Sequence, residues 1–146
     1  MGYPNKSLSN FELMEMTKNL PHFRGVFMRD HLPKKPRKNE CAILNLDDKN
    51  GAGTHWTCWF KRGNTRIYFD SYGVITPIEL QTYLKRSNEG PCIQRSTDEI
   101  QPRGTSICGY LCIEVLKRLS NGESFLNVLQ TLNKKRNVSK QIWSKF

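Results

Sequence analysis

The sequence predicts one α+β domain in which a small, mostly antiparallel sheet packs against a central helix. The 146 residues fit a single compact domain, and a chain of this length can fold without disulfides or metal ions. Short segments rich in Trp, Thr, Ile and Phe are separated by turn signals, as strands are. Other segments begin with capping residues or have apolar residues at helical spacing. We therefore expect residues 1–146 to form one domain.

The predicted sheet is built around a hairpin. Its two strands flank the tight turn Gly63-Asn64, and a buried apolar strand precedes them. Turn residues over 47–53, including Asn50-Gly51, separate that apolar strand from the hairpin. The expected strands are 41–46, 54–61, 65–70 and 92–95, with a short additional strand at 25–28.

Four helices are expected. Ser9 with Glu12, and Thr76 with Glu79, each have the spacing of a capping box at a helix start. The helix that begins at Cys108 has apolar residues on one face, as a core helix does. The expected helices are 10–19, 77–86, 108–119 and 124–132.

The chain is strongly basic, with a formal net charge of +10. Such a charge favours polyanions, of which nucleic acid is the first candidate, although a merely solubilising surface is the alternative interpretation. The basic residues occur in short clusters: Lys34, Lys35, Arg37 and Lys38; Lys61 and Arg62; Lys85 and Arg86; Lys117 and Arg118; Lys134, Lys135 and Arg136.

The five cysteines form neither a CxxC pair nor a zinc-ligand spacing with histidine, so we expect no metal. Their odd number indicates mostly free thiols in a reducing compartment. The N-terminal stretch is polar and no long apolar run follows, so neither a secretory signal nor a membrane span is expected. We expect a monomer that does not bind membranes.

Cys108 is the candidate nucleophile. A cysteine attacks an acyl group as the thiolate, and a helix N-terminus favours that negative charge. Cys108 follows a loop of Pro, Gly, Thr and Ser and opens a predicted helix. Gly109 has no side chain, so we expect a substrate backbone to approach there.

His55 is the candidate general base, and Asp70 is the candidate acid that orients it. His22 and His31 lie in a polar, proline-containing segment, whereas His55 begins a predicted strand after small residues. Asp70 ends the strand paired with it, so the hairpin can bring the two side chains together. Asp70 can instead open an Asx-turn with Ser71 and the residue after it, or can do both.

Gln101 is the candidate oxyanion donor. It lies seven residues before Cys108, across a loop that can fold back, so its amide and the Cys108 backbone N–H can form a donor pair. Gln94 is the competing candidate, but it lies inside a predicted strand.

These residues, taken together, resemble one family. The set His55-Trp56, Asp70-Ser-Tyr-Gly73, Gln101 and Cys108-Gly109 is similar to that of the adenovirus-type maturation cysteine proteases (adenain), including the Polinton/Maverick and adintovirus-like proteases. The seven-residue interval before Cys108 and the second cysteine, Cys112, four residues after it also match. The order His, acid, Gln, Cys is that of the wider superfamily that includes the SUMO-specific proteases. The resemblance covers residues 7–119.

The resemblance implies a papain-like, SUMO-protease-like fold and a thiol endopeptidase. Its substrates would be viral or transposon capsid and core precursors, cut after small residues such as Gly, in the virion and host nucleus or otherwise inside the cell. Trp56 would pack beside the histidine and the substrate. By resemblance, DNA and an activating peptide stimulate the enzyme. Cys92 would form the disulfide with that peptide, although its interval to Cys108 is two residues shorter than in adenovirus enzymes.

Two alternatives remain open. The same four residues would serve a deconjugase of ubiquitin-like proteins. The basic composition also suits a non-catalytic, DNA-binding virion protein with a decayed protease fold.

Overall fold

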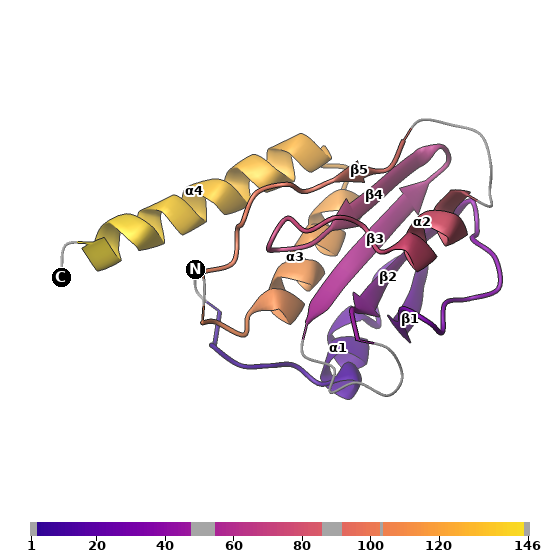
Figure 1. The fold of residues 1–146 in the computed structure, drawn as a ribbon, viewed down its shortest axis with the longest axis horizontal. Helices are drawn as coiled ribbons and strands as arrows, with labels where there is room; N and C mark the ends of the chain where they lie inside the picture. Colours follow the sequence, from indigo (N-terminus) through magenta and orange to yellow (C-terminus); the bar gives the residue numbers. More distant parts are fainter. Residues whose placement is uncertain (1–2, 48–54, 86–91, 103, 145–146) are drawn as a thin grey trace.

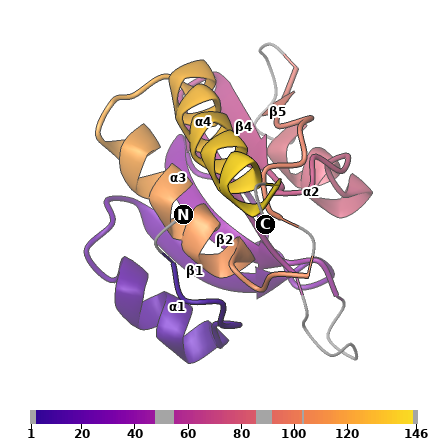
Figure 2. The same ribbon diagram turned by 90° about the vertical axis from the view of Figure 1, so that its left-hand side faces the viewer.

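The computed structural model is a five-stranded sheet with helices on both of its faces (Figures 1 and 2). It describes residues 3–47, 55–85, 92–102 and 104–144, with side chains up to Lys135. Helices α1, α3 and α4 cover one face, and α2 covers the other. The elements are α1 (Asn10–Thr17), β1 (Phe23–Met28), β2 (Asn39–Asn45), β3 (Trp56–Arg62), β4 (Thr65–Phe69), α2 (Ile78–Lys85), β5 (Gln94–Arg95), α3 (Cys108–Ser120) and α4 (Phe125–Ser144).

The α+β prediction is confirmed, with two differences in detail. The strands follow the order β1-β2-β3-β4-β5, and the central pairs β2–β3 and β3–β4 are antiparallel as predicted. The edge strand β1 pairs in parallel with β2, and the edge strand β5 pairs in parallel with β4. In each pair, the segment that connects the two strands returns the chain to the end of the sheet at which the first strand began. Helix α4 continues well past the predicted end at residue 132. The predicted turn at Asn50-Gly51 lies outside the described residues.

Side chains of the sheet alternate between two hydrophobic cores. In β2, Cys41 and Ile43 face the core under α3, whereas Ala42 and Leu44 face the core under α2. The larger core contains Leu111, Cys112, Val115, Leu116 and Leu119, the residues of the predicted helix face. Helix α3 is therefore the central helix against which the sheet packs, and it begins at the candidate nucleophile.

The N-terminal helix is fixed by the predicted capping box. The Ser9 hydroxyl accepts a hydrogen bond from the Glu12 backbone N–H (3.1 Å), and the Glu12 carboxylate accepts one from the Ser9 N–H (3.1 Å). Helix α1 lies against β1 and α3. Within the described part of the chain, no helix has the length and apolar character needed to span a bilayer.

Candidate active site

The hairpin brings His55 and Asp70 together. In the β3–β4 ladder, Cys58 pairs with Phe69, and continuing this register sets His55 opposite Tyr72. The Nε2 atom of His55 lies 2.9 Å from Oδ1 of Asp70. The ring of Tyr72 stacks on the imidazole with a centroid distance of 5.0 Å. His55 is thus held from two sides, by a carboxylate and by an aromatic face.

Asp70 makes both of the contacts that the sequence suggested. Its side chain is fully buried, and Oδ1 accepts a hydrogen bond from the Tyr72 N–H (2.8 Å) in addition to contacting His55. The Asx-turn and the pairing with histidine therefore use the same oxygen. The turn fixes the carboxylate relative to the backbone, so the imidazole meets an oriented partner.

Cys108 lies at the first residue of α3 and is only 4% exposed. The Trp56 backbone N–H points at its sulfur at 3.4 Å, and the His55 side chain forms a hydrogen bond with the Cys108 side chain. Because Nε2 of His55 pairs with Asp70, Nδ1 is the nitrogen left to face the thiol. Cys108, His55 and Asp70 therefore form one continuous chain of contacts.

The electrostatics of His55 favour its cation. Burial lowers the pKa of His55, but the hydrogen bonds with Asp70 and Cys108 raise it and prevail, so that the pKa rises from 6.5 to about 9. The imidazole is therefore protonated at neutral pH, beside a sulfur that also receives a backbone N–H. An imidazolium next to a cysteine sulfur is the arrangement that stabilises a thiolate nucleophile.

The second cysteine of α3 has a different environment. Cys112 is fully buried, its thiol donates to the Trp56 carbonyl at 3.4 Å, and burial raises its pKa well above the ordinary value. A buried thiol of this kind stays protonated and is a packing residue. All five cysteines are free, and Cys92 is exposed.

Gln101 is near this chain of contacts but is joined to it indirectly. It is buried, its Oε1 lies 2.6 Å from the Ser71 hydroxyl, and its Nε2 lies 2.7 Å from the Thr105 carbonyl. Ser71 follows Asp70, and Thr105 precedes Cys108 by three residues. The competing candidate, Gln94, lies exposed in β5.

Trp56 and Gly109 support the site from within the core. The Trp56 indole is buried and its N–H donates to the Leu8 carbonyl at 2.9 Å. The expectation that Gly109 opens a path for substrate is wrong. A Cβ at Gly109 would lie 3.2 Å from Leu8 and 3.3 Å from Leu13, so the missing side chain admits the α1 region instead. Both residues hold the N-terminal segment against the start of α3.

Sequence reasoning missed three residues that surround the acid. Tyr72 stacks on His55, Ser71 binds Gln101, and the Ser96 hydroxyl binds the backbone N–H and carbonyl of Asp70 (2.9 and 2.8 Å). The sequence Asp-Ser-Tyr-Gly at residues 70–73 marks Ser71 and Tyr72 as neighbours of the acid. No local pattern marks Ser96, because its contact depends on the pairing of β5 with β4.

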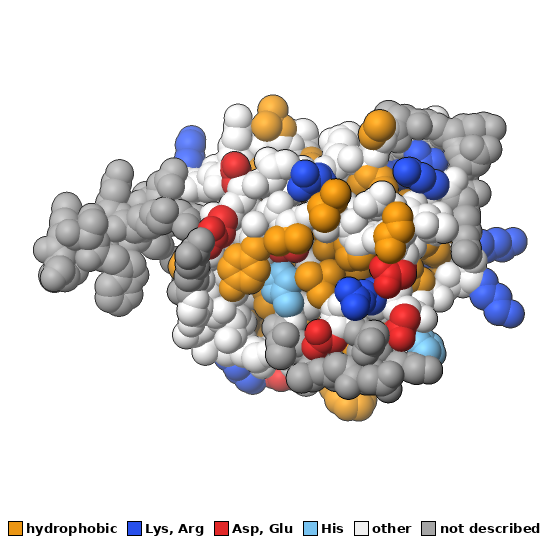
Figure 3. Space-filling model, viewed as in Figure 1, with side chains coloured by type: hydrophobic (Ala, Val, Ile, Leu, Met, Phe, Trp, Pro, Cys, Tyr) orange, Lys and Arg blue, Asp and Glu red, His pale blue; other side chains and the backbone are white. Residues whose placement is uncertain are grey.

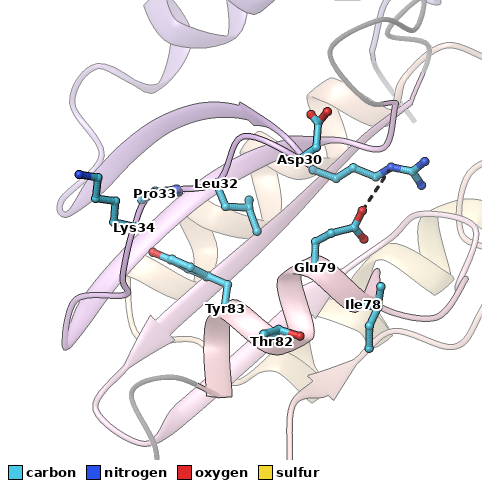
Figure 4. Close-up of a pocket in the computed structure, with 9 residues that line it drawn as sticks. Asp30, Leu32, Pro33, Lys34, Ile78, Glu79, Thr82 and Tyr83 are labelled. Atoms are coloured by element: carbon cyan, nitrogen blue, oxygen red, sulfur yellow. Dashed lines mark ion pairs between the residues drawn. The ribbon is translucent and has the colours of Figure 1, made fainter.

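Two hollows lie near these elements. A groove of about 520 Å³ is bordered by Trp56, by Ser7–Asn10, by the end of β1 and by Asn45, and of the predicted site residues only Trp56 lines it. A separate depression of about 460 Å³ lies between the loop after β1 and α2, where an Arg29–Glu79 ion pair (3.8 Å) crosses it (Figure 4). The second depression contains none of the candidate catalytic residues.

The surface beside the acid is apolar. The segment between Gly73 and α2 exposes Val74 and Ile75, and Ile78 at the start of α2 is exposed as well. Hydrophobic side chains gather over the middle of the face shown in Figure 3, with charged residues around them. In the ranges 3–47, 55–85, 92–102 and 104–144, no group of His, Cys, Asp and Glu is arranged to hold a metal ion.

Comparisons with known proteins agree with this geometry. The chain is 31% identical over 123 residues to the protease of human adenovirus B serotype 3, a match that covers 71% of the chain and 58% of that protein. It is 28% identical over 117 residues to the protease of bovine adenovirus 2, covering 69% and 56%. The chain thus spans less than two thirds of the length of these relatives. No protein-family model matches it.

The fold has solved counterparts. Two crystal structures of the ASFV pS273R protease, one with selenomethionine, align with TM-scores of 0.62 and 0.60 over 91% of the chain and 67% of theirs, at 16% identity. The likeness to these structures confirms the predicted α+β fold. The chain is similar to the adenovirus proteases, and the predicted resemblance to that family is confirmed.

Proposed function

We propose that the chain is a cysteine endopeptidase that processes viral or transposon precursor proteins. The observation that carries the proposal is the placement of the His55 ring between the Asp70 carboxylate and the Cys108 thiol. The relationship to adenovirus proteases supports a viral precursor as substrate, with action in the virion and host nucleus. The apolar surface beside the acid suits a polypeptide rather than a small polar molecule.

The reaction begins with acylation of Cys108. The sulfur attacks the scissile carbonyl carbon, which breaks the carbonyl π bond and forms a tetrahedral oxyanion. The protonated His55 then gives its proton to the departing amine as the C–N bond breaks, leaving a thioester on Cys108. Asp70 keeps the ring in place and stabilises its cation.

Deacylation reverses the role of the histidine. His55, now neutral, takes a proton from water as the water oxygen attacks the thioester carbonyl, and the thiolate leaves. Each tetrahedral oxygen needs fixed donors, which we assign to the Gln101 amide and the Cys108 backbone N–H at the start of α3. The four residues then have the roles of nucleophile, base, orienting acid and oxyanion donor.

The burial of the nucleophile supports cleavage after small residues. Cys108 is only 4% exposed, and His55, Tyr72 and Trp56 all lie against or near it. A bulky side chain on the residue being acylated would have to displace one of these packed groups. Glycine needs the least space at that position, so we expect a preference for cleavage after Gly.

The test is co-expression of candidate capsid precursors with wild-type protein or with Cys108→Ala, followed by mass spectrometry. We expect new peptide termini after small residues with wild type alone. Uncut precursors, together with labelling of Cys108 by a ubiquitin-like protein bearing a C-terminal glycine aldehyde, would instead identify a deconjugase. If no substrate is cut and iodoacetamide does not react with Cys108 at neutral pH, the chain is not a cysteine hydrolase.

We also propose that DNA binds the loop between β1 and β2. The cluster Lys34, Lys35, Arg37 and Lys38 in this loop is exposed. Other predicted clusters are used internally: Lys61 is buried with its amine on two backbone carbonyls, and Arg118 pairs with Glu114 and Glu123. The net charge therefore overstates the cationic surface, and among the residues whose side chains the structure describes, this loop is the most concentrated exposed basic cluster.

Reversing three of these charges tests DNA binding. In Lys35→Glu/Arg37→Glu/Lys38→Glu, the slope of log Kd against log salt should fall by about 2–3, because each phosphate contact contributes about 0.9. A matched variant with reversed charges at Lys6, Lys18 and Lys117 should change the slope much less. Equal slopes in the two variants would exclude the loop as the main DNA contact. Cleavage rates with and without DNA would then show whether DNA stimulates the enzyme.

The activating peptide remains a prediction for which Cys92 is the candidate. Its thiol is exposed, as a mixed disulfide with a peptide requires. A cysteine-containing peptide from the precursor proteins should add its mass to wild type and not to Cys92→Ala. Adduct formation at another cysteine would remove Cys92 from this role.

A further inference from the structure

The acid and the candidate oxyanion donor are fastened to each other through backbone and hydroxyl contacts. The Ser71 carbonyl accepts hydrogen bonds from the N–H groups of Ile100 (2.7 Å) and Gln101 (3.0 Å). The Ser96 hydroxyl accepts a hydrogen bond from the Asp70 backbone N–H and donates one to the Asp70 carbonyl. The segments 70–73 and 96–101 therefore form one junction, which we call the acid junction, and residue 71 is at its centre.

The side-chain contacts at the acid junction determine how the Gln101 amide is oriented. The Thr105 carbonyl can only accept a hydrogen bond, so the group 2.7 Å from it must be the amide nitrogen. The amide oxygen then faces Ser71, whose hydroxyl must be the donor across 2.6 Å. Both side chains are buried, so water does not compete for these contacts. An amide NH2 carries two hydrogens, so donating one to Thr105 leaves the other for an oxyanion.

We propose that Ser71 is a positioning residue that holds Gln101 with its NH2 turned toward the loop that leads into Cys108. This inference rests on the proposed function, since it concerns the oxyanion donor of the same site. Ser71 makes no contact with the reacting atoms and acts through Gln101. Removing its hydroxyl leaves the buried amide oxygen without its donor, and the amide is then free to rotate away from the productive orientation.

Two reactions of Cys108 separate this role from a general structural one. Alkylation by iodoacetamide needs the thiolate but forms no oxyanion, whereas peptide cleavage needs both. In Ser71→Ala we expect alkylation with the wild-type rate and pH profile, while kcat/KM for a peptide falls about 10-fold and a peptide aldehyde binds correspondingly less tightly. Ser96→Ala is the matched control. It removes a hydroxyl from the same junction that touches Asp70 rather than Gln101, so it should change alkylation and cleavage together.

A double variant supplies the decisive comparison. Gln101→Ala should lower kcat/KM by about 100-fold or more, and adding Ser71→Ala to it should cause no further loss. If Ser71→Ala proves poorly folded, Ser71→Cys, with a similar volume and a weaker donor, should give a smaller loss in cleavage with normal alkylation. Cleavage by Ser71→Ala at the wild-type rate, equal losses in alkylation and cleavage, or an additive double variant would each overturn the inference. Wild-type protein that cleaves nothing would instead overturn the proposed function.

Discussion

Replacing Asp70 by Asn tests the electrostatic basis of the site. The substitution keeps the shape of the side chain and its turn contact with Tyr72, but it removes the negative charge beside His55. The pKa of His55 lies about 2.5 units above its ordinary value of 6.5, which corresponds to roughly 3 kcal/mol in favour of the imidazolium. Among the groups that raise the pKa of His55, Asp70 makes the largest contribution. We therefore expect the pKa of His55 to fall by about 1–2 units in Asp70→Asn.

The predicted consequence is a displaced alkaline limb of activity. In the proposed mechanism protonated His55 is the acid that expels the amine, so wild-type kcat/KM should decline near pH 9, and the Asp70→Asn variant should decline nearer pH 7–8. NMR titration of the imidazole measures the same pKa directly. In Cys108→Ala the pKa should also fall, but by less than in Asp70→Asn, since the cysteine contributes less.

Stability gives an independent measure with a fixed sign. Because the folded-state pKa of His55 is raised, its contribution to folding is complete below pH 6.5 and is lost as the pH rises through about 9. Urea unfolding at both ends of this range should therefore show a smaller alkaline loss for Asp70→Asn than for wild type. Titrations at other sites are common to both proteins and cancel in the difference. An alkaline limb and an NMR pKa that stay within about 0.3 units of wild type would refute this reasoning.

Three further predictions concern the scaffold. Ser9→Ala should lower the unfolding free energy by about 1 kcal/mol in urea titrations, because the capping box of α1 is lost. Gly73→Ala should be strongly destabilising, with aggregation or a lower Tm, because φ is +70° and the added Cβ would lie 2.4 Å from the Thr97 carbonyl oxygen; a wild-type Tm would contradict this. Glu40→Gln should cost about 3 kcal/mol in urea unfolding, since it leaves the partly buried Arg24 without its buried counter-charge, and a loss below about 1 kcal/mol would contradict this.

The sequence predicts the elements that local chemistry specifies. The capping box at Ser9, the turn Gly63-Asn64 and the apolar face of the Cys108 helix each depend on residues close in sequence, and all three occur in the structure. The hairpin also predicts that His55 and Asp70 meet, because one tight turn fixes the register of both strands. The contact between a thiol and an imidazole that are far apart in sequence was inferred from residue chemistry and resemblance, and the structure brings the two side chains together.

The remaining parts depend on contacts that no local pattern specifies. The parallel pairing of β5 is set by where the chain returns after α2, and only two residues form the strand. That pairing places Ser96 against Asp70 and brings the start of the loop at Gln101 under Ser71. Serine is a common loop residue with many ordinary explanations, so neither hydroxyl could be assigned a role before the fold was known. The prediction for Gly109 was wrong because a glycine also has more than one explanation: the space beside it can admit either a substrate or a packed side chain.

The site is assembled from two supports that can be disturbed separately. The candidate nucleophile depends on the seam between α1 and α3, where Gly109 lets Leu8 and Leu13 pack against the start of the helix. The acid and the candidate oxyanion donor depend on the acid junction, which shares none of those contacts. His55 bridges the two, because its ring touches both Asp70 and Cys108. A substitution in the seam should therefore move the sulfur away from an intact His–Asp pair, whereas one in the junction should disturb either the acid or the candidate oxyanion donor beside an intact sulfur.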